Sequence, residues 1–487
     1  MQKRSTPFNE IEFETKVAHV QPWDEGAPRI NGPSIYGASP KRDFLYLIPT
    51  TGERPMRFSA APLPAGLVLD SEKGIISGKA ENAGAFDVTL TAENRLGKDS
   101  KQFRIVIGDH SLALTPPMGW NSWNCFRSDI NQTQITEVAD AMVSSGFAAH
   151  GYSLISIDSG WQSKKRGGPF NSIVPADTFP DMAALCKHIH SLGLKAGMYS
   201  SPYVSPWGTD GIGTTEGLPD TSFPFYLYYK YIGMTKHERE DALQWAAWGF
   251  DHLKYDWVNI DMHHTARMRE ALDANGRDML FSLVTGLDFK DAQKASELAN
   301  FYRSNADTAP TWESIRKNGF GNDEWNPYIG PGHWLDLDML ATTPRDSKSL
   351  THRELLSHVS RWMMRPSPIL LDCDPRSTDD FLKDILCNDE IIAVNQDALG
   401  KPAATIFKDA IWDIQLKPLA DGNCAVAFFN LSDDRMAVAP DIPLTHWVGH
   451  GFKVRDLWAR EDLNDVGDDF IVGVAPHSAR VYKIFVH

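Results

Sequence analysis

Five aspartates stand where predicted strands end: Asp158, Asp256, Asp307, Asp336 and Asp338. Carboxylates in an active site can transfer protons or attack carbon. Six aromatic residues lie in the same segments: Trp120, Trp123, Trp161, Tyr199, Trp257 and Trp334. Carboxylates bind hydroxyl groups, and flat rings stack on the apolar face of a pyranose. A single Asp after a strand most often caps a helix, and a single Trp most often belongs to the core. The repeated coincidence of both types at strand ends favours a carbohydrate-active site.

The segments that carry these residues follow a repeating helix–strand pattern from about 114 to 400. Amphipathic helices are predicted to end at glycines, which adopt the left-handed conformation at helix ends: Gly146, Gly193, Gly249 and Gly276. Short apolar strands are predicted at 118–120, 154–157, 194–199, 252–255, 279–283, 301–303, 333–335 and 368–371. Eight such units predict a (β/α)8 TIM barrel, whose active residues stand at the carboxyl ends of its strands.

Segments of alternating apolar and polar residues flank the barrel. Residues 86–92 and 103–107 alternate in this way before it, and residues 425–429 and 479–485 after it. We therefore expect a multidomain chain. Its parts are an N-terminal extension (1–34), an Ig-like β-sandwich (35–110), the catalytic barrel (111–400) and a C-terminal antiparallel β-sandwich (401–487).

Composition narrows the class of protein. Hydrophobic residues make up 42% and charged residues 23%, as in ordinary globular chains. The net charge of −15 argues against a nucleic-acid partner, and no apolar stretch is long enough to span a membrane. The five cysteines form no disulfide framework and no C-x-x-C pair, and neither a metal nor another cofactor is expected. The first residues lack the apolar core of a signal peptide, yet the sandwich modules suggest a periplasmic or secreted enzyme.

An ordered series of motifs in the barrel resembles glycoside hydrolase family 27, the α-galactosidase family. The matching segments are 115–123 (TPPMGWNSW), 157–161 (IDSGW), 193–199 (GLKAGMY), 253–256 (LKYD), 302–307 (YRSNAD), 332–340 (GHWLDLDML) and 393–400 (AVNQDALG). Residues 63–67, 74–78 and 89–94 are similar to an Ig or cadherin-like module, which usually serves as a spacer or an adhesive part.

The resemblance implies roles for particular residues. Asp256 would be the nucleophile and Asp307 the general acid/base of a retaining hydrolase, whose carboxyl groups stand about 5–5.5 Å apart. Lys254 would help to keep Asp256 ionised, because residues two apart on a strand point to one side. The subsite for the terminal sugar would be lined by Trp123, Asp158, Tyr199, Lys254, Arg303 and Asp338, with Trp161 and Trp257 as further aromatic candidates. Asp336 is at least as well explained as a supporting or capping residue.

The sequence departs from the family pattern at three places. Ser159 replaces the second of two adjacent aspartates that grip O4 and O6 of galactose, and Thr285 and Gly286 replace larger residues beside O2. Trp257-Val258-Asn259 stands where the family has a cysteine, and its usual partner is missing too, so that disulfide cannot form. The loop from Tyr203 to Tyr231 is long and aromatic; it could wall the leaving part of an oligosaccharide, pack on the barrel rim or contact another subunit.

The resemblance implies an exo-acting, retaining glycoside hydrolase that removes a terminal α-linked galactose or galactose-like residue from an oligo- or polysaccharide. The departures leave alternatives open: a β-L-arabinopyranosidase, an α-N-acetylgalactosaminidase, an isomalto-dextranase or a hydrolase of a decorated, for example sulfated, galactan. An inverting hydrolase would place Asp256 and Asp307 about 6.5–9.5 Å apart. A non-catalytic carbohydrate-binding protein is the alternative from another class. The sequence is compatible with an oligomer and does not define one.

Overall fold

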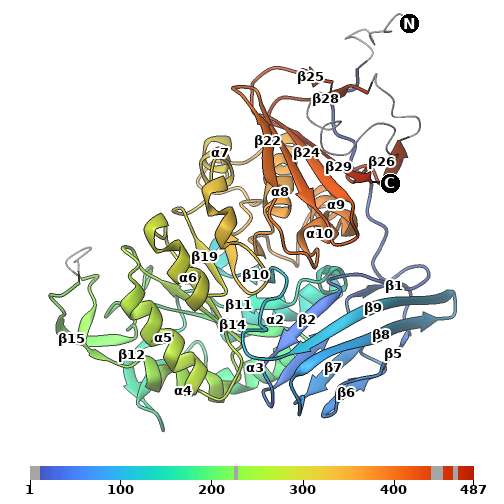
Figure 1. The fold of residues 1–487 in the computed structure, drawn as a ribbon. Coiled ribbons are helices and arrows are strands. Elements are labelled where there is room, and N and C mark those ends of the chain that lie inside the picture. Colours follow the sequence, from blue (N-terminus) through green and yellow to red (C-terminus); the bar gives the residue numbers. More distant parts are fainter. Residues whose placement is uncertain (1–10, 224–228, 440–452, 464–469, 487) are drawn as a thin grey trace, which may run out of the picture.

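A computed structural model describes residues 11–223, 229–439, 453–463 and 470–486. Figure 1 shows the barrel with the N-terminal β-sandwich (blue) at its lower right and the C-terminal sandwich (orange to red) above it. Within the described residues, no helix is both long and apolar enough to cross a membrane.

The barrel is one sheet of eight parallel strands that follow each other in chain order. They are β10 (Met118–Asn121), β11 (Leu154–Ser156), β14 (Lys195–Ser200), β17 (His252–Asp256), β18 (Leu280–Val284), β19 (Phe301–Arg303), β20 (Trp334–Asp336) and β21 (Ile369–Leu371). β21 pairs with β10, and the Leu340 N–H donates to the Leu370 carbonyl (2.9 Å) just beyond β20, which joins the two ends of the sheet. The predicted TIM barrel is confirmed. Its strands are almost entirely buried, as expected where helices cover a parallel sheet.

Helices follow the strands and surround the sheet. They are α1 (Trp123–Phe126), α2 (Gln132–Ser144), α3 (Met182–Ser191), α4 (Glu238–Trp248), α5 (Met262–Ala274), α6 (Ala292–Leu298), α7 (Trp312–Gly319), α8 (His352–Met364), α9 (Asp380–Leu386) and α10 (Asp389–Asn395), with 3-10 turns η2 (Phe147–His150), η3 (Phe289–Asp291) and η4 (Asp323–Tyr328). Two hairpins extend the loops after β11 and β14: β12 (Gln162–Gly167) with β13 (Ser172–Pro175), and β15 (Thr215–Pro219) with β16 (Gly233–Lys236). The predicted glycines after the helices have positive φ, for example 103° at Gly249, so they do end helices in the left-handed region.

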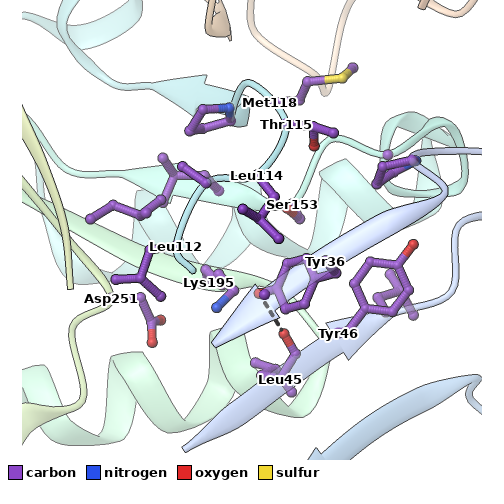
Figure 2. Close-up of a pocket in the computed structure, with 18 of the residues that line it drawn as sticks. Tyr36, Leu45, Tyr46, Leu112, Leu114, Thr115, Met118, Ser153, Lys195 and Asp251 are labelled. Atoms are coloured by element: carbon purple, nitrogen blue, oxygen red, sulfur yellow. Dashed lines mark hydrogen bonds between the residues drawn. The ribbon is translucent and has the colours of Figure 1, made fainter. Parts of the chain in front are cut away.

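The N-terminal sandwich lies against the amino ends of the barrel strands. Its strands are β1 (Arg29–Ile30), β2 (Ile35–Ala38), β3 (Phe44–Leu47), β4 (Thr50–Thr51), β5 (Arg57–Ala61), β6 (Leu67–Asp70), β7 (Ile75–Gly78), β8 (Gly84–Asn94) and β9 (Gly97–Ile107), in sheets ordered β2-β9-β8-β5 and β3-β7-β6 with a β1-β4 pair. Arg277 of the barrel contacts Asp43 of the sandwich (3.0 Å) and Asp251 of the barrel (2.6 Å). A cavity of about 110 Å³ remains between the two parts, where Lys195 faces the ring of Tyr36 at 5.5 Å (Figure 2). The sandwich is thus fixed to the barrel by ionic and apolar contacts.

The C-terminal module is an antiparallel sandwich beside α8. It contains β22 (Ala404–Lys408), β23 (Trp412–Pro418), β24 (Cys424–Asn430), β25 (Met436–Val438), β26 (Lys453–Asp456), β27 (Glu461–Leu463), β28 (Val472–Val474) and β29 (Ala479–Phe485). Its six-stranded sheet has the order β22-β23-β24-β29-β26-β27, and β25 pairs with β28. The N-terminal segment packs on this module: the Ala18 N–H donates to the Trp458 carbonyl, and the Ala475 N–H donates to the Phe13 carbonyl, both at 2.9 Å. Figure 1 shows this segment passing the C-terminal sandwich before it reaches β1.

Candidate active site

A cavity of about 370 Å³ opens at the carboxyl ends of the barrel strands. Most of the residues predicted from the sequence meet in its wall: Trp123, Asp158, Ser159, Tyr199, Lys254, Asp256, Thr285, Arg303, Asp307 and Asp338. They come from the ends of seven segments that are far apart along the chain, and the barrel brings them together. The cavity therefore contains carboxylates, cations and aromatic rings within one space.

Asp256 is the last residue of β17 and lies at the inner end of this site. Its side chain is buried, and the Thr285 hydroxyl donates to its Oδ1 at 2.8 Å. Burial raises the pKa of Asp256 to about 6, while the Lys254 ammonium and the Thr285 hydroxyl act in the opposite direction. Thr285 follows β18, the strand that pairs with β17, so this hydrogen bond follows directly from the sheet register. Thr285 thus contacts the carboxylate of Asp256 directly.

Asp307 has a different environment in the same cavity. Its side chain is 72% exposed, and its Oδ1 accepts a hydrogen bond from Arg303 Nη2 at 3.0 Å. Partial desolvation raises the pKa of Asp307, but the charges of Arg303 and Lys254 outweigh this effect and hold that pKa below its usual value. One carboxyl is therefore enclosed and proton-binding, and the other is open to solvent and acidic.

Lys254 lies on β17 beside Tyr199 of β14, to which it is paired in the sheet. Its Nζ donates to Asp158 Oδ2 at 2.6 Å and lies 5.8 Å from the centre of the Tyr199 ring. Burial lowers the pKa of Lys254, but Asp158 and Asp256 more than compensate, so the pKa is raised and the amine stays charged. Burial and the charges of Asp256 and Asp158 raise the pKa of Tyr199 well above its usual value. The floor of the cavity is thus a compact network of opposite charges.

A second network surrounds Arg303 at the end of β19. Arg303 Nη2 contacts Asp338 Oδ2 at 3.1 Å, and Asp338 also accepts the Thr308 N–H at 2.6 Å. Asp338 has a positive φ of 82°, which is rare for a residue with a Cβ atom, and these contacts hold it there. Asp336 accepts the Asp338 N–H at 2.8 Å and does not line the cavity, which fits a supporting role.

Ser159 and Tyr199 hold one wall of the cavity in place. The Ser159 hydroxyl donates to the Trp207 carbonyl at 2.5 Å, and the Trp207 N–H donates to the Tyr199 hydroxyl at 3.2 Å. Gly208 has a φ of +73°, and a Cβ there would lie only 2.4 Å from the Trp123 ring. The loop after β14 is therefore bound through its backbone to three of the predicted sugar-binding residues.

Trp161 and Trp257 are not among the residues that line the cavity. The Trp161 indole is buried and donates to the Tyr199 carbonyl at 2.8 Å. Trp257 is also buried, and its ring packs edge-on against Tyr255 at 5.1 Å. The structure therefore places both indoles behind the wall, where they support it.

The aromatic loop is divided between core and surface. Tyr203 is buried and donates to the Val258 carbonyl at 3.0 Å, and Phe223 packs against His264 at 4.3 Å, whereas Tyr229 is 63% exposed. Two of these rings therefore pack on the barrel rim. Phe225, Tyr226 and Tyr228 lie outside the described residues.

Sequence reasoning missed several residues of the cavity wall: Asn124, Val258, Thr308, Met339 and Arg345. Arg345 donates to Asn124 Oδ1 at 2.8 Å and to the Thr308 carbonyl at 3.0 Å, which links the loops after β10, β19 and β20. Thr308 directly follows Asp307 and could have been found from that motif, but no pattern marks Arg345. All five cysteines are free thiols.

Comparisons with known proteins agree with this architecture. A family model described as alpha galactosidase A matches residues 115–397, a model of the alpha galactosidase C-terminal beta sandwich domain matches 409–484, and an Ig-domain model matches 27–108. Alpha-galactosidase 2 of Arabidopsis thaliana is 34% identical over 413 residues, which cover 82% of this chain and 96% of the plant protein. An alpha-galactosidase of Oryza sativa subsp. japonica is 33% identical, covering 81% of this chain and 91% of its own. A crystal structure of a Bacteroides fragilis protein has a TM-score of 0.85 at 34% identity and covers 96% of this chain and 99% of its own.

Proposed function

The chain belongs to the α-galactosidase family and is a glycoside hydrolase, and we propose that it removes terminal α-linked galactose with retention of configuration. The observation that carries this proposal is the pair of unlike carboxyl groups in one cavity. Asp256 is enclosed at the inner end, and Asp307 is open to solvent at the rim. An enclosed carboxylate can approach the anomeric carbon, and an exposed one can reach the leaving oxygen and water.

The reaction proceeds in two displacements. First, an Asp256 oxygen bonds to the anomeric carbon while the bond from that carbon to the leaving oxygen breaks, and Asp307 gives its proton to that oxygen. Asp307 then takes a proton from water, the water oxygen bonds to the anomeric carbon, and the ester bond to Asp256 breaks. We expect the two carboxyl groups to act at the separation of about 5–5.5 Å typical of retaining enzymes.

The reactive form of this pair carries one proton, and that proton must be on Asp307. The protein groups around the two carboxyls set the reverse order: Asp256 has a pKa of about 6, and that of Asp307 is below its usual value. These shifts therefore favour the proton on Asp256 over Asp307 in the singly protonated pair. A sugar that excludes water from Asp307 and binds Arg303 would raise the pKa of Asp307 and favour proton transfer to it. We infer that substrate binding itself places the proton for catalysis.

The remaining polar groups suit the binding of a sugar. Lys254 with Asp158, and Arg303 with Asp338, form two charged pairs that can each donate to and accept from hydroxyl groups. Trp123 supplies a flat ring in the wall. Binding energy from these groups would position the anomeric carbon over Asp256.

The experiment is the release of 4-nitrophenol from a panel of α-galactoside, β-L-arabinopyranoside, α-N-acetylgalactosaminide and α-glucoside. We expect turnover of the α-galactoside and its loss in Asp256→Ala, while Asp210→Ala, which changes an 84% exposed carboxylate, keeps wild-type activity. Proton NMR of the first product should show the α-anomer of galactose. Appearance of the β-anomer first would refute retention, and full activity of Asp256→Ala would refute the assignment of the nucleophile.

A specific observation favours a second candidate, a β-L-arabinopyranosidase. The Ser159 hydroxyl proton is committed to the Trp207 carbonyl, so Ser159 cannot donate it to a sugar O6 at the same time. A pyranose without the C6 hydroxymethyl group has no O6, so it would lose no hydrogen bond at this position. A higher kcat/KM on the β-L-arabinopyranoside than on the α-galactoside in the same panel would select this candidate.

A further inference from the structure

A groove of about 460 Å³ runs between α7 of the barrel and the C-terminal sandwich. Trp312, Arg316 and Phe320 lie four residues apart along α7 and its end, so they form one face of the helix. Lys317 extends this face, and Lys408 with its neighbours at the end of β22 forms the opposite side. We call this feature the α7 groove.

The α7 groove begins on the loop that carries Asp307. Thr308 lines the catalytic cavity and Trp312 lines the groove, and four residues of chain span at most about 14 Å. The general acid must face the leaving oxygen, so the leaving part of a substrate departs on the side of Asp307. The groove therefore starts within two or three sugar lengths of the catalytic cavity, beyond the segment that carries Asp307.

The charges of the α7 groove differ from those of the whole chain. Arg316 and Lys317 are exposed, and neither forms an ion pair or a side-chain hydrogen bond within the described residues. Lys408 lies 3.8 Å from Asp413, a loose contact. Two carboxylates also line the groove, Glu313 and Asp409, and Asp409 Oδ1 already accepts two backbone N–H groups of its own turn. In a chain with a net charge of −15, the groove has three cations against two carboxylates, so its lining is locally positive and can attract anions.

Aromatic rings accompany these cations. The Trp312 ring stacks on His477 with 4.7 Å between centroids and 19° between planes, which fixes its orientation. Phe320 lies at the C-terminal end of α7, and its ring packs edge-on against that of Phe429, with 5.1 Å between centroids. Fixed rings beside unpaired cations are suited to a saccharide that carries negative charge.

We propose that the α7 groove binds the leaving chain of an anionic galactoside polymer, with Arg316, Lys317 and Lys408 contacting its carboxylate or sulfate groups. This proposal rests on the proposed function, because it takes Asp307 as the group that faces the leaving oxygen. It defines the substrate class of the enzyme as a charged glycan that extends from the catalytic cavity along α7.

The test uses one polymer in three forms: guar galactomannan, its carboxymethyl derivative and its sulfated derivative. Galactose release is measured for the wild type and for the double variant Arg316→Glu/Lys317→Glu, with 4-nitrophenyl α-galactoside as the substrate that does not reach the groove. We expect the double variant to have a kcat/KM on the anionic polymers about tenfold or more below that of the wild type at low salt. Its kcat/KM on neutral guar and on the aryl galactoside should change little. The difference should vanish at high salt, where charges are screened. A larger fall on one derivative identifies sulfate or carboxylate as the group recognised.

The matched control is Lys290→Glu/Lys294→Glu, which reverses two exposed cations elsewhere on the barrel. Affinity electrophoresis in gels that contain each polymer measures binding apart from turnover. Equal activity of the α7 variant and wild type on all three polymers, or equal retardation in the anionic gels, would overturn the proposal. If the wild type failed to cleave the aryl galactoside, the proposed function would fail instead, and the electrophoresis would still test the groove.

Discussion

The hydrogen bond from Thr285 to Asp256 allows a quantitative test of the proton arrangement. Replacing Thr285 by Val removes a donor 2.8 Å from a buried carboxylate. A hydrogen bond to a charged group contributes about 1.5–3 kcal/mol, which corresponds to a rise of roughly 1–2 units in the pKa of Asp256 from its present value of about 6. Because the proton of the singly protonated pair then moves further towards Asp256, the reactive form with the proton on Asp307 becomes about 10- to 100-fold rarer.

Two changes in the pH profile of kcat/KM should follow. The basic limb reports loss of the last proton of the pair, which is held mainly by Asp256, so it should move from near pH 6 to higher pH by the same 1–2 units. The plateau should fall about 10- to 100-fold, while the acid limb, set by Asp307, stays in place.

The assay is the release of 4-nitrophenol from the α-galactoside between about pH 3 and 9. Thr285→Ser keeps the hydroxyl group and should retain the wild-type profile. If the basic limb of Thr285→Val is unchanged, or moves to lower pH, the hydrogen bond does not hold Asp256 in its charged form. A shift of the acid limb alone would show that Asp256 is the more acidic of the two carboxyl groups, which would refute this pKa order.

Three further perturbations follow from the contacts of the structure. Asp307→Ala should reduce kcat/KM on a galactosyl disaccharide about 10²- to 10⁴-fold and less on the 4-nitrophenyl galactoside, whose leaving group needs little protonation; equal losses in parallel assays would contradict the acid role. Arg277→Met should lower the free energy of unfolding by about 3 kcal/mol in urea titrations, because it removes a partner of the buried Asp251. Desolvation raises the pKa of Asp251, but His190 and Arg277 more than offset it and hold that pKa below its unfolded value, so its stabilisation is present above the unfolded pKa and is lost as pH falls. The variant should therefore unfold at a higher pH on acidification, and an unchanged acid midpoint would count against this contact. Ser159→Ala should free the Trp207 carbonyl and raise KM more than it lowers kcat, and steady-state kinetics showing only a fall in kcat would argue that Ser159 does not act through the wall.

The barrel could be predicted from the sequence because its signals are local. Short apolar strands alternate with amphipathic helices that end at glycine, and each of the eight predicted strands overlaps an observed one, for example 252–255 with β17 (His252–Asp256). A strand buried on both faces needs a continuous apolar run, and only a few chain segments contain one. Residues at strand ends such as Asp158 and Lys254 could therefore be placed in one cavity before their contacts were known.

Other parts of the site depend on contacts that no local pattern records. Arg345, in an irregular loop, meets Asn124 of the short helix α1 across 221 positions of sequence. Burial raises the pKa of Asp256 and the charges of Arg303 and Lys254 lower that of Asp307, yet both residues are aspartates at or just beyond the end of a strand. The place of Trp161 behind the wall also depends on tertiary packing, because its spacing after β11 suits either the core or the cavity.

The loop that contacts Ser159 explains why a serine fits at this position. A second carboxylate at this position would lie beside the Trp207 carbonyl, and two acceptors without a proton between them repel each other. The serine hydroxyl removes this conflict, since it donates to that carbonyl while Tyr199 accepts the N–H of the same residue. Gly208 can then lie flat on the Trp123 ring, where any Cβ atom would clash. The identity of residue 159 and the course of the loop after β14 are therefore coupled, and Ser159→Asp alone should displace this wall before it adds a contact to the sugar.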